Sequence, residues 1–167
     1  MASIHYVHKY LITNLNDRLT SDQSRAIDTL IEFLLNWKND CCFLLKGYAG
    51  TGKTTLLGTL VRALREQSVA CVLLAPTGRA AKVLSSATGF QSSTIHREIY
   101  AIAERNDGTP TYRLRENKRT NTLFVVDEAS IIGAGMDNSP SHRHGGLLRD
   151  LVEYIRGGRH CKLLLSG

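Results

Sequence analysis

Short apolar runs alternate along the chain with longer segments in which apolar residues recur every three or four positions. Uninterrupted apolar runs are typical of strands covered on both faces of a parallel sheet, and the periodic segments are typical of amphipathic helices. This alternation predicts an α/β fold, a parallel sheet with helices on both faces. The predicted strands are residues 41–45, 69–75, 122–126 and 161–165.

The predicted helices carry recognisable start signals and apolar stripes. Thr20 fits an N-cap with Gln23 three residues later, which is the pattern of a capping box. The stripe of this first helix is Ile27, Leu30, Ile31 and Leu34. The stripe of the second is Leu56, Leu57, Leu60 and Leu64. Shorter helices are predicted over 79–86, within 93–103 and over 147–156.

Two segments lack both patterns. Residues 104–121 are polar and charged around a Gly/Pro break, and we interpret them as a surface excursion, such as a hairpin. Residues 133–146 are rich in Gly, Ser, Asn and His, which predicts a mobile loop. His142 and His144 in that loop offer too few ligands for a metal ion, so we expect no structural metal.

Composition is that of one ordinary soluble domain, with 167 residues, 43% hydrophobic and 22% charged. No apolar run approaches the roughly 18 residues of a membrane span, and no signal peptide is recognisable, so we expect a cytoplasmic protein without a membrane partner. The four cysteines lie in apolar runs and are predicted to be buried free thiols. The net charge of +6 is compatible with a nucleic-acid partner.

The strongest chemical signal is the segment 47–54, GYAGTGKT, which matches the phosphate-loop pattern G-x-x-x-x-G-K-[ST]. It follows a predicted strand and opens a predicted helix, the context in which this pattern binds ATP with Mg²⁺. Lys53 would bring positive charge to the β- and γ-phosphates and act in catalysis, and the Thr54 hydroxyl would ligate Mg²⁺. The predicted nucleotide-binding residues of the loop are Gly47, Ala49, Gly50, Thr51, Gly52, Lys53, Thr54 and Thr55.

A second acidic signal, Asp127-Glu128, ends the strand predicted over 122–126. Carboxyl ends of parallel strands form the ligand crevice of such folds. Asp127 would therefore hold Mg²⁺ and Glu128 would deprotonate the attacking water as the catalytic base. The alternative is that the pair only ends a strand and caps the next turn.

These and other motifs together resemble, in chain order, the conserved blocks of superfamily 1 DNA helicases, most of all the RecD-like branch with its Dda and Pif types. The blocks are LTSDQ at 19–23, GYAGTGKTT at 47–55, APTGRAA at 75–81, TIH at 94–96, VVDEAS at 125–130 and LLLSG at 163–167. The resemblance implies a P-loop NTPase (RecA-like) domain over 19–167, preceded by an N-terminal extension, 1–18. The third helicase motif would continue past Gly167, so we expect a single incomplete domain whose second RecA-like domain is absent.

The resemblance also implies roles for particular residues. Gln23 would read the adenine edge, although it would equally complete the capping box with Thr20. Thr94 and His96 would contact DNA, although a buried structural histidine is an open alternative. The loop gripping single-stranded DNA would be Pro76, Thr77, Gly78 and Arg79, which otherwise serves only as a strand-to-helix connection and helix cap. A basic cluster at Arg113, Arg115, Lys118 and Arg119 would either follow DNA or form a solvated face.

The function expected from these residues is that of an ATP-dependent DNA helicase, which couples ATP hydrolysis to translocation on single-stranded DNA. Its partners would be single-stranded DNA and the second RecA-like domain. Because that domain would supply the arginines of the ATP site, the isolated chain is expected to turn over slowly or not at all. The alternatives are a non-motor P-loop ATPase, a nucleotide-dependent switch, or a purely nucleotide-binding module.

Overall fold

The structure, a computed structural model, describes residues 4–15, 19–36, 42–104, 108, 110–133 and 146–167. Helices and strands alternate through most of this length, as the sequence predicts. The elements are α1 (Ile4–Leu15), α2 (Ser21–Leu35), β1 (Cys42–Leu45), α3 (Lys53–Glu66), β2 (Ala70–Ala75), α4 (Gly78–Thr88), β3 (Ser92–Thr94), α5 (Ile95–Ile99), β4 (Tyr100–Glu104), β5 (Pro110–Leu114), β6 (Thr122–Val126), the 3₁₀ turn η2 (Ala129–Ile131), α6 (Gly146–Arg156) and β7 (Lys162–Ser166).

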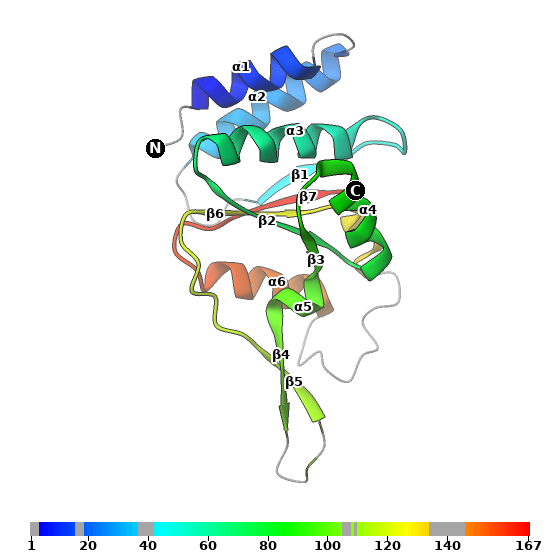
Figure 1. Cartoon of the computed structure of the whole chain (residues 1–167), viewed down its shortest axis with the longest axis vertical. Coiled ribbons are helices and arrows are strands. Elements are labelled where there is room, and N and C mark those ends of the chain that lie inside the picture. Colours follow the sequence, from blue (N-terminus) through cyan, green and yellow to red (C-terminus); the bar gives the residue numbers. More distant parts are fainter. Residues whose placement is uncertain (1–3, 16–18, 37–41, 105–107, 109, 134–145) are drawn as a thin grey trace.

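A five-stranded sheet forms the centre of the molecule, in the order β1-β7-β6-β2-β3, and all of its neighbouring strands are parallel (Figure 1). The predicted parallel sheet is therefore confirmed. Parallel strands bring their carboxyl ends to one edge. The segments that follow β1, β6 and β7 consequently meet at that edge, where the sequence predicts the nucleotide site.

Helices cover both faces of the sheet because successive strand residues point to opposite sides. Leu73 and Val125 belong to a core shared with α1, α2, α3 and α4. Leu74 and Phe124, one position away, belong to a second core with α5 and α6. Figure 1 shows these two layers above and below the strands.

The start of α2 confirms the predicted capping box. The Gln23 N–H donates to Thr20 Oγ1 at 3.2 Å, and the Thr20 N–H donates to Gln23 Oε1 at 2.8 Å. These two bonds satisfy backbone donors that the first turn of a helix leaves unpaired. The stripe of α2 then buries Ile27 and Leu30 completely.

Two predictions about β1 are wrong: that it is covered on both faces, and that its cysteine is buried. The run 41–45 was expected to be covered on both faces, but Leu44 is 52% exposed. Within the described residues β1 pairs with β7 alone, so it is an edge strand with one open side. Cys42 is accordingly exposed rather than buried. Cys161 is buried, as predicted. Burial raises the pKa of the Cys71 thiol to about 12. Cys41 lies outside the described residues.

The helix predicted within 93–103 is confirmed, but it is short. It is limited to α5, which is capped by Thr94, and the chain then becomes β4. β4 pairs antiparallel with β5, with Ile102 opposite Tyr112, and this hairpin projects away from the sheet (Figure 1). The hairpin predicted within 104–121 is thus confirmed, but its first strand begins earlier, at Tyr100. The predicted loop at 133–146 falls almost entirely outside the described residues, as do His142 and His144.

Helix α1 has no counterpart among the sequence-based predictions, which treated 1–18 only as an extension. It packs against α2 and α3, with Val7 and Leu11 fully buried in the core they share. The Tyr6 hydroxyl also donates to the Glu66 carboxylate at the end of α3. None of the helices in the described part of the chain is long and apolar enough to cross a membrane.

Candidate nucleotide-binding site

The loop between β1 and α3 has a backbone suited to surround an anion. Gly50 and Gly52 have φ of +79° and +82°, in the left-handed region that glycine adopts without strain. A Cβ added at Gly47 would lie 2.8 Å from Thr51 Oγ1, so the loop closes too tightly there for a side chain. Gly52 is the N-cap of α3 and offers no side-chain cap, which leaves the first N–H groups of the helix available to a phosphate.

Lys53, the first residue of α3, folds back over this loop. Its Nζ donates to the carbonyl oxygen of Gly47 and, at 3.0 Å, to that of Tyr48. The Thr51 hydroxyl donates to the same Tyr48 carbonyl at 2.8 Å. The ammonium group is therefore held at the mouth of the loop, while the Tyr48 side chain is 91% exposed.

The structure brings the two predicted Mg²⁺ ligands into direct contact. The Thr54 hydroxyl donates to Asp127 Oδ2 at 2.8 Å, across 73 residues of sequence. Asp127 is only 8% exposed. Its other oxygen, Oδ1, accepts from the Glu128 N–H at 3.0 Å and from the Ser166 hydroxyl at 2.9 Å. A hydroxyl beside a carboxylate is a donor set that suits Mg²⁺, which favours oxygen ligands and keeps several waters.

Glu128 stands in a strained backbone conformation. Its φ is +56° and its ψ is 35°, in the left-handed region, where residues other than glycine are uncommon. Its side chain is exposed, next to Asp127 and at the start of η2. Strain of this kind collects at functional sites, where the surroundings impose it.

Gln23 joins the start of α2 to the phosphate loop. Besides its capping bond, its Nε2 donates to the Thr51 carbonyl oxygen at 3.0 Å. The capping role is therefore confirmed, and the side chain also lies at the nucleotide loop. Its reading of adenine stays a prediction.

The two segments predicted to touch DNA lie side by side. β2 and β3 are neighbours, with Ala75 opposite Thr94, so the connections after both strands leave the same edge of the sheet. Thr77 accepts from the Ala80 N–H at 3.1 Å and caps α4, and Thr94 accepts from the Arg97 N–H at 3.2 Å and caps α5. The cap alternative for residues 76–79 is confirmed, and Thr94 is a helix cap that the sequence reasoning did not predict. The other residues predicted to contact DNA differ in exposure. Pro76 is buried, whereas Gly78 and Arg79 are exposed. His96 is half-buried, and its ring centroid lies 5.7 Å from that of Tyr100.

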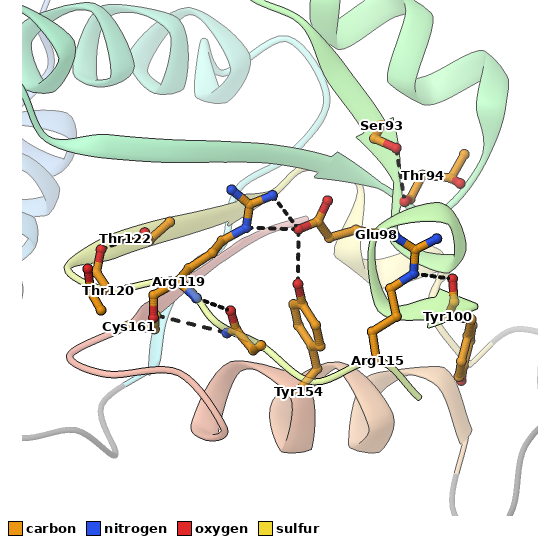
Figure 2. Close-up of polar contacts among 11 residues, drawn as sticks. Ser93, Thr94, Glu98, Tyr100, Arg115, Arg119, Thr120, Thr122, Tyr154 and Cys161 are labelled. Atoms are coloured by element: carbon orange, nitrogen blue, oxygen red, sulfur yellow. Dashed lines mark hydrogen bonds and ion pairs between the residues drawn. The ribbon is translucent and has the colours of Figure 1, made fainter. Parts of the chain in front are cut away.

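Two residues of the basic cluster, Arg115 and Arg119, are committed to contacts within the protein (Figure 2). Arg119 donates to Glu98 Oε1 through Nε at 3.1 Å and Nη2 at 2.9 Å. Tyr154 of α6 donates to the same oxygen at 3.2 Å, and Arg115 Nε donates to the Tyr100 carbonyl at 2.7 Å. These bonds fix the base of the hairpin to α5 and α6.

Tyr100 adds a further tie to α6. Its hydroxyl donates to Asp150 Oδ2 at 2.5 Å, and burial, followed by this bond, raises the pKa of Tyr100 above its ordinary value. The phenol therefore stays a neutral donor. In the described ranges no group of three or more His, Cys, Asp or Glu side chains is arranged to hold a metal ion.

Sequence reasoning missed Ser166. It is fully buried at the end of β7 and bonds directly to Asp127. The available signal was a single hydroxyl ending the apolar run LLLS, because a buried polar side chain needs a partner.

Comparison with known proteins agrees with this architecture. A protein-family model described as an AAA domain matches residues 18–138. The ATP-dependent DNA helicase dda of Enterobacteria phage T4 is 37% identical over 81 residues, 48% of this chain and 18% of that protein. The RecBCD enzyme subunit RecD of Mycolicibacterium smegmatis is 32% identical over 154 residues, 66% of this chain and 27% of that protein.

A parallel sheet with helices on both faces and a phosphate loop after its first strand defines an α/β ATPase domain of the P-loop type. The chain belongs to the AAA domain family, and its predicted resemblance to the N-terminal domain of RecD-like superfamily 1 helicases is confirmed. It spans less than a third of the length of either helicase relative.

The strain at Glu128 gives a direct prediction about stability. Glu128→Gly should raise the free energy of unfolding by about 1 kcal/mol relative to Glu128→Ala, because only glycine adopts this φ without a steric penalty. Both variants remove the carboxylate, so the comparison isolates the backbone. Urea denaturation without nucleotide measures the difference, and equal stabilities for the two variants would show that the backbone here is unstrained.

Proposed function

We propose that this chain is the ATP-binding domain of an ATP-dependent DNA helicase that couples ATP hydrolysis to translocation on single-stranded DNA. Residues 19–167 would be its first RecA-like domain. The observation that carries the proposal is the contact of Thr54 with Asp127 directly beside the glycine-lined loop. The phosphate loop and the acidic residue that we propose for magnesium and nucleotide thus lie at one edge of the sheet.

Phosphate binding would use the loop backbone and Lys53. The N–H groups at the start of α3 would face the β-phosphate, and Lys53 would exchange its bonds to two loop carbonyls for bonds to phosphate oxygens. Mg²⁺ would take the Thr54 oxygen and phosphate oxygens as ligands, with Asp127 holding its shell, and would neutralise the charge on the phosphates.

Adenine recognition is assigned to Gln23. A glutamine amide has two N–H donors and an oxygen with two lone pairs. The capping bond uses one lone pair and the Thr51 bond uses one N–H, so one lone pair and one N–H remain on an amide whose plane these two bonds hold. An acceptor and a donor side by side match the amino group and N7 of adenine.

Hydrolysis would need a base next to the metal, and Glu128 follows the magnesium residue directly. Its exposed carboxylate is suited to orient and deprotonate water. The arginines that stabilise the transition state would come from the second RecA-like domain, so closure of the two domains would switch hydrolysis on.

Single-stranded DNA would lie across the connections that follow β2 and β3. The Thr77 hydroxyl accepts from α4 but keeps its own hydrogen for a phosphate oxygen, and the exposed Arg79 adds charge. Thr94 and His96 would contact the next nucleotide along. The AAA-family match and the two helicase relatives support this reading over a non-motor ATPase.

The nucleotide assignment is tested by titrating a fluorescent ATP analogue with Mg²⁺ into the wild type and Lys53→Ala. Loss of a charge-assisted contact should weaken binding by about tenfold or more. Lys46→Ala is the matched control, since this exposed lysine precedes the loop and its removal changes the net charge equally. Equal affinities of Lys53→Ala and wild type would remove Lys53 from the site.

The DNA assignment is tested by fluorescence anisotropy with a labelled oligothymidine across a series of salt concentrations. Arg79→Ala should weaken binding and reduce the slope of log K against log salt by about 0.7, the value for one phosphate of a single strand. Arg62→Ala, an exposed charge on α3, should leave the slope unchanged, and neither should alter affinity for the ATP analogue. Unchanged binding of Arg79→Ala at every salt concentration would favour the non-motor ATPase or switch.

A further inference from the structure

Strand β7 lies between the two halves of the nucleotide site. The sheet order places it next to β1, which leads into the phosphate loop, and next to β6, which ends at Asp127. Ser166 is opposite Leu45 in the β1 pairing, and Leu165 is opposite Val126 in the β6 pairing. The last residues of β7 are therefore beside both the start of the loop and the metal residue.

Ser166 is a polar side chain that follows three leucines at the end of β7. It is fully buried, and its hydroxyl donates to Asp127 Oδ1 at 2.9 Å. Burying a hydroxyl without a partner is unfavourable, and the bond to Asp127 offsets that cost for Ser166. That bond goes to the carboxylate that the proposed function assigns to Mg²⁺.

The bonds to Asp127 are divided between its two oxygens. Oδ1 accepts from Ser166 and from the Glu128 N–H, and Oδ2 accepts from Thr54. Two donors on Oδ1 prevent the carboxylate from rotating, so Oδ2 stays directed toward the hydroxyl of α3. Partners of this kind, one step removed from a metal, set the orientation of the groups that hold it.

The position of Ser166 is itself fixed from the following residue. The Gly167 N–H donates to the Leu45 carbonyl at 3.1 Å, and the Gly167 carbonyl accepts from the Gly47 N–H at 3.3 Å. A Cβ at Gly167 would lie 2.8 Å from the Ser130 nitrogen, so only glycine fits between the loop and η2. The residue that follows Ser166 is thus bonded directly to the start of the phosphate loop.

We propose that Ser166 is a positioning residue that orients Asp127 for Mg²⁺, and so sets the magnesium dependence of nucleotide binding. This inference rests on the proposed function, in which Thr54 and Asp127 hold the metal. It assigns to Ser166 no contact with nucleotide, so nucleotide binding without Mg²⁺ should not depend on its hydroxyl.

The test is a Mg²⁺ titration of the complex between the 167-residue chain and a fluorescent ATP analogue, with a parallel measurement in EDTA. Ser166→Ala should weaken Mg²⁺ binding by about tenfold to a hundredfold, the range for partners one step from a metal, and leave affinity in EDTA unchanged. Ser166→Thr keeps the hydroxyl and should restore Mg²⁺ affinity. Thr122→Val is the matched control, because it removes a buried hydroxyl from the other end of β6, where the hydroxyl donates to the Thr120 carbonyl.

The outcomes separate this inference from the proposal beneath it. Mg²⁺ dependence absent in the wild type would contradict the proposed metal site itself. Mg²⁺ dependence present in the wild type and unchanged in Ser166→Ala would overturn the role of Ser166 alone. Equal losses with and without Mg²⁺ would also overturn it, because they would indicate a general structural effect. Should Ser166→Ala be recovered unfolded, Ser166→Cys keeps a side chain of similar size with a much weaker donor and is judged by the same criteria.

Discussion

The nearly buried carboxylate of Asp127 is the constraint around which this domain is organised. A charge withdrawn from water must be compensated by hydrogen bonds, and here the donors come from α3, from β7 and from the neighbouring backbone. These donors meet only because the parallel sheet brings the ends of β1, β7 and β6 to one edge. The same geometry places the glycine-lined loop and the start of α3 at this edge. The strand order therefore determines both how the sheet packs and where the residues of the site lie.

The other face of the sheet has a different task. Its core joins α5 and α6, and Glu98, Tyr154 and Arg119 tie these helices to the segment after the hairpin (Figure 2). Tyr100 and Asp150 add a second tie at the first residue of β4. The hairpin thus projects from a base held by these bonds, and it follows the connection after β3 that we propose for DNA. Arg119, which the sequence offers as a candidate for DNA contact, instead bonds to Glu98 and helps to hold this base.

The fold was predictable where local patterns coincide with the final environment. The capping box at Thr20, the stripe of α3 and the apolar strand 122–126 all have the predicted structure, because each pattern is decided within a few residues. Prediction failed where tertiary partners decide. The apolar run of β1 predicts a central strand, but in the described residues β1 pairs on one side only. The helix after Thr94 ends before Tyr100, where the chain pairs with β5 instead. The phosphate loop and Asp127 could be recognised as motifs. The contact between Ser166 and Asp127 could not, because it depends on the pairing of β7 with β6.

The most direct test of this account is the structure of the chain bound to a non-hydrolysable ATP analogue and Mg²⁺. The account predicts that the phosphates occupy the loop from Gly47 to Thr54 and that the metal lies about 2.1 Å from the Thr54 hydroxyl oxygen, the usual Mg²⁺ distance. Asp127 should then lie beside the metal shell with its bond to Ser166 retained. Phosphates bound elsewhere, or a metal remote from Thr54 and Asp127, would contradict it.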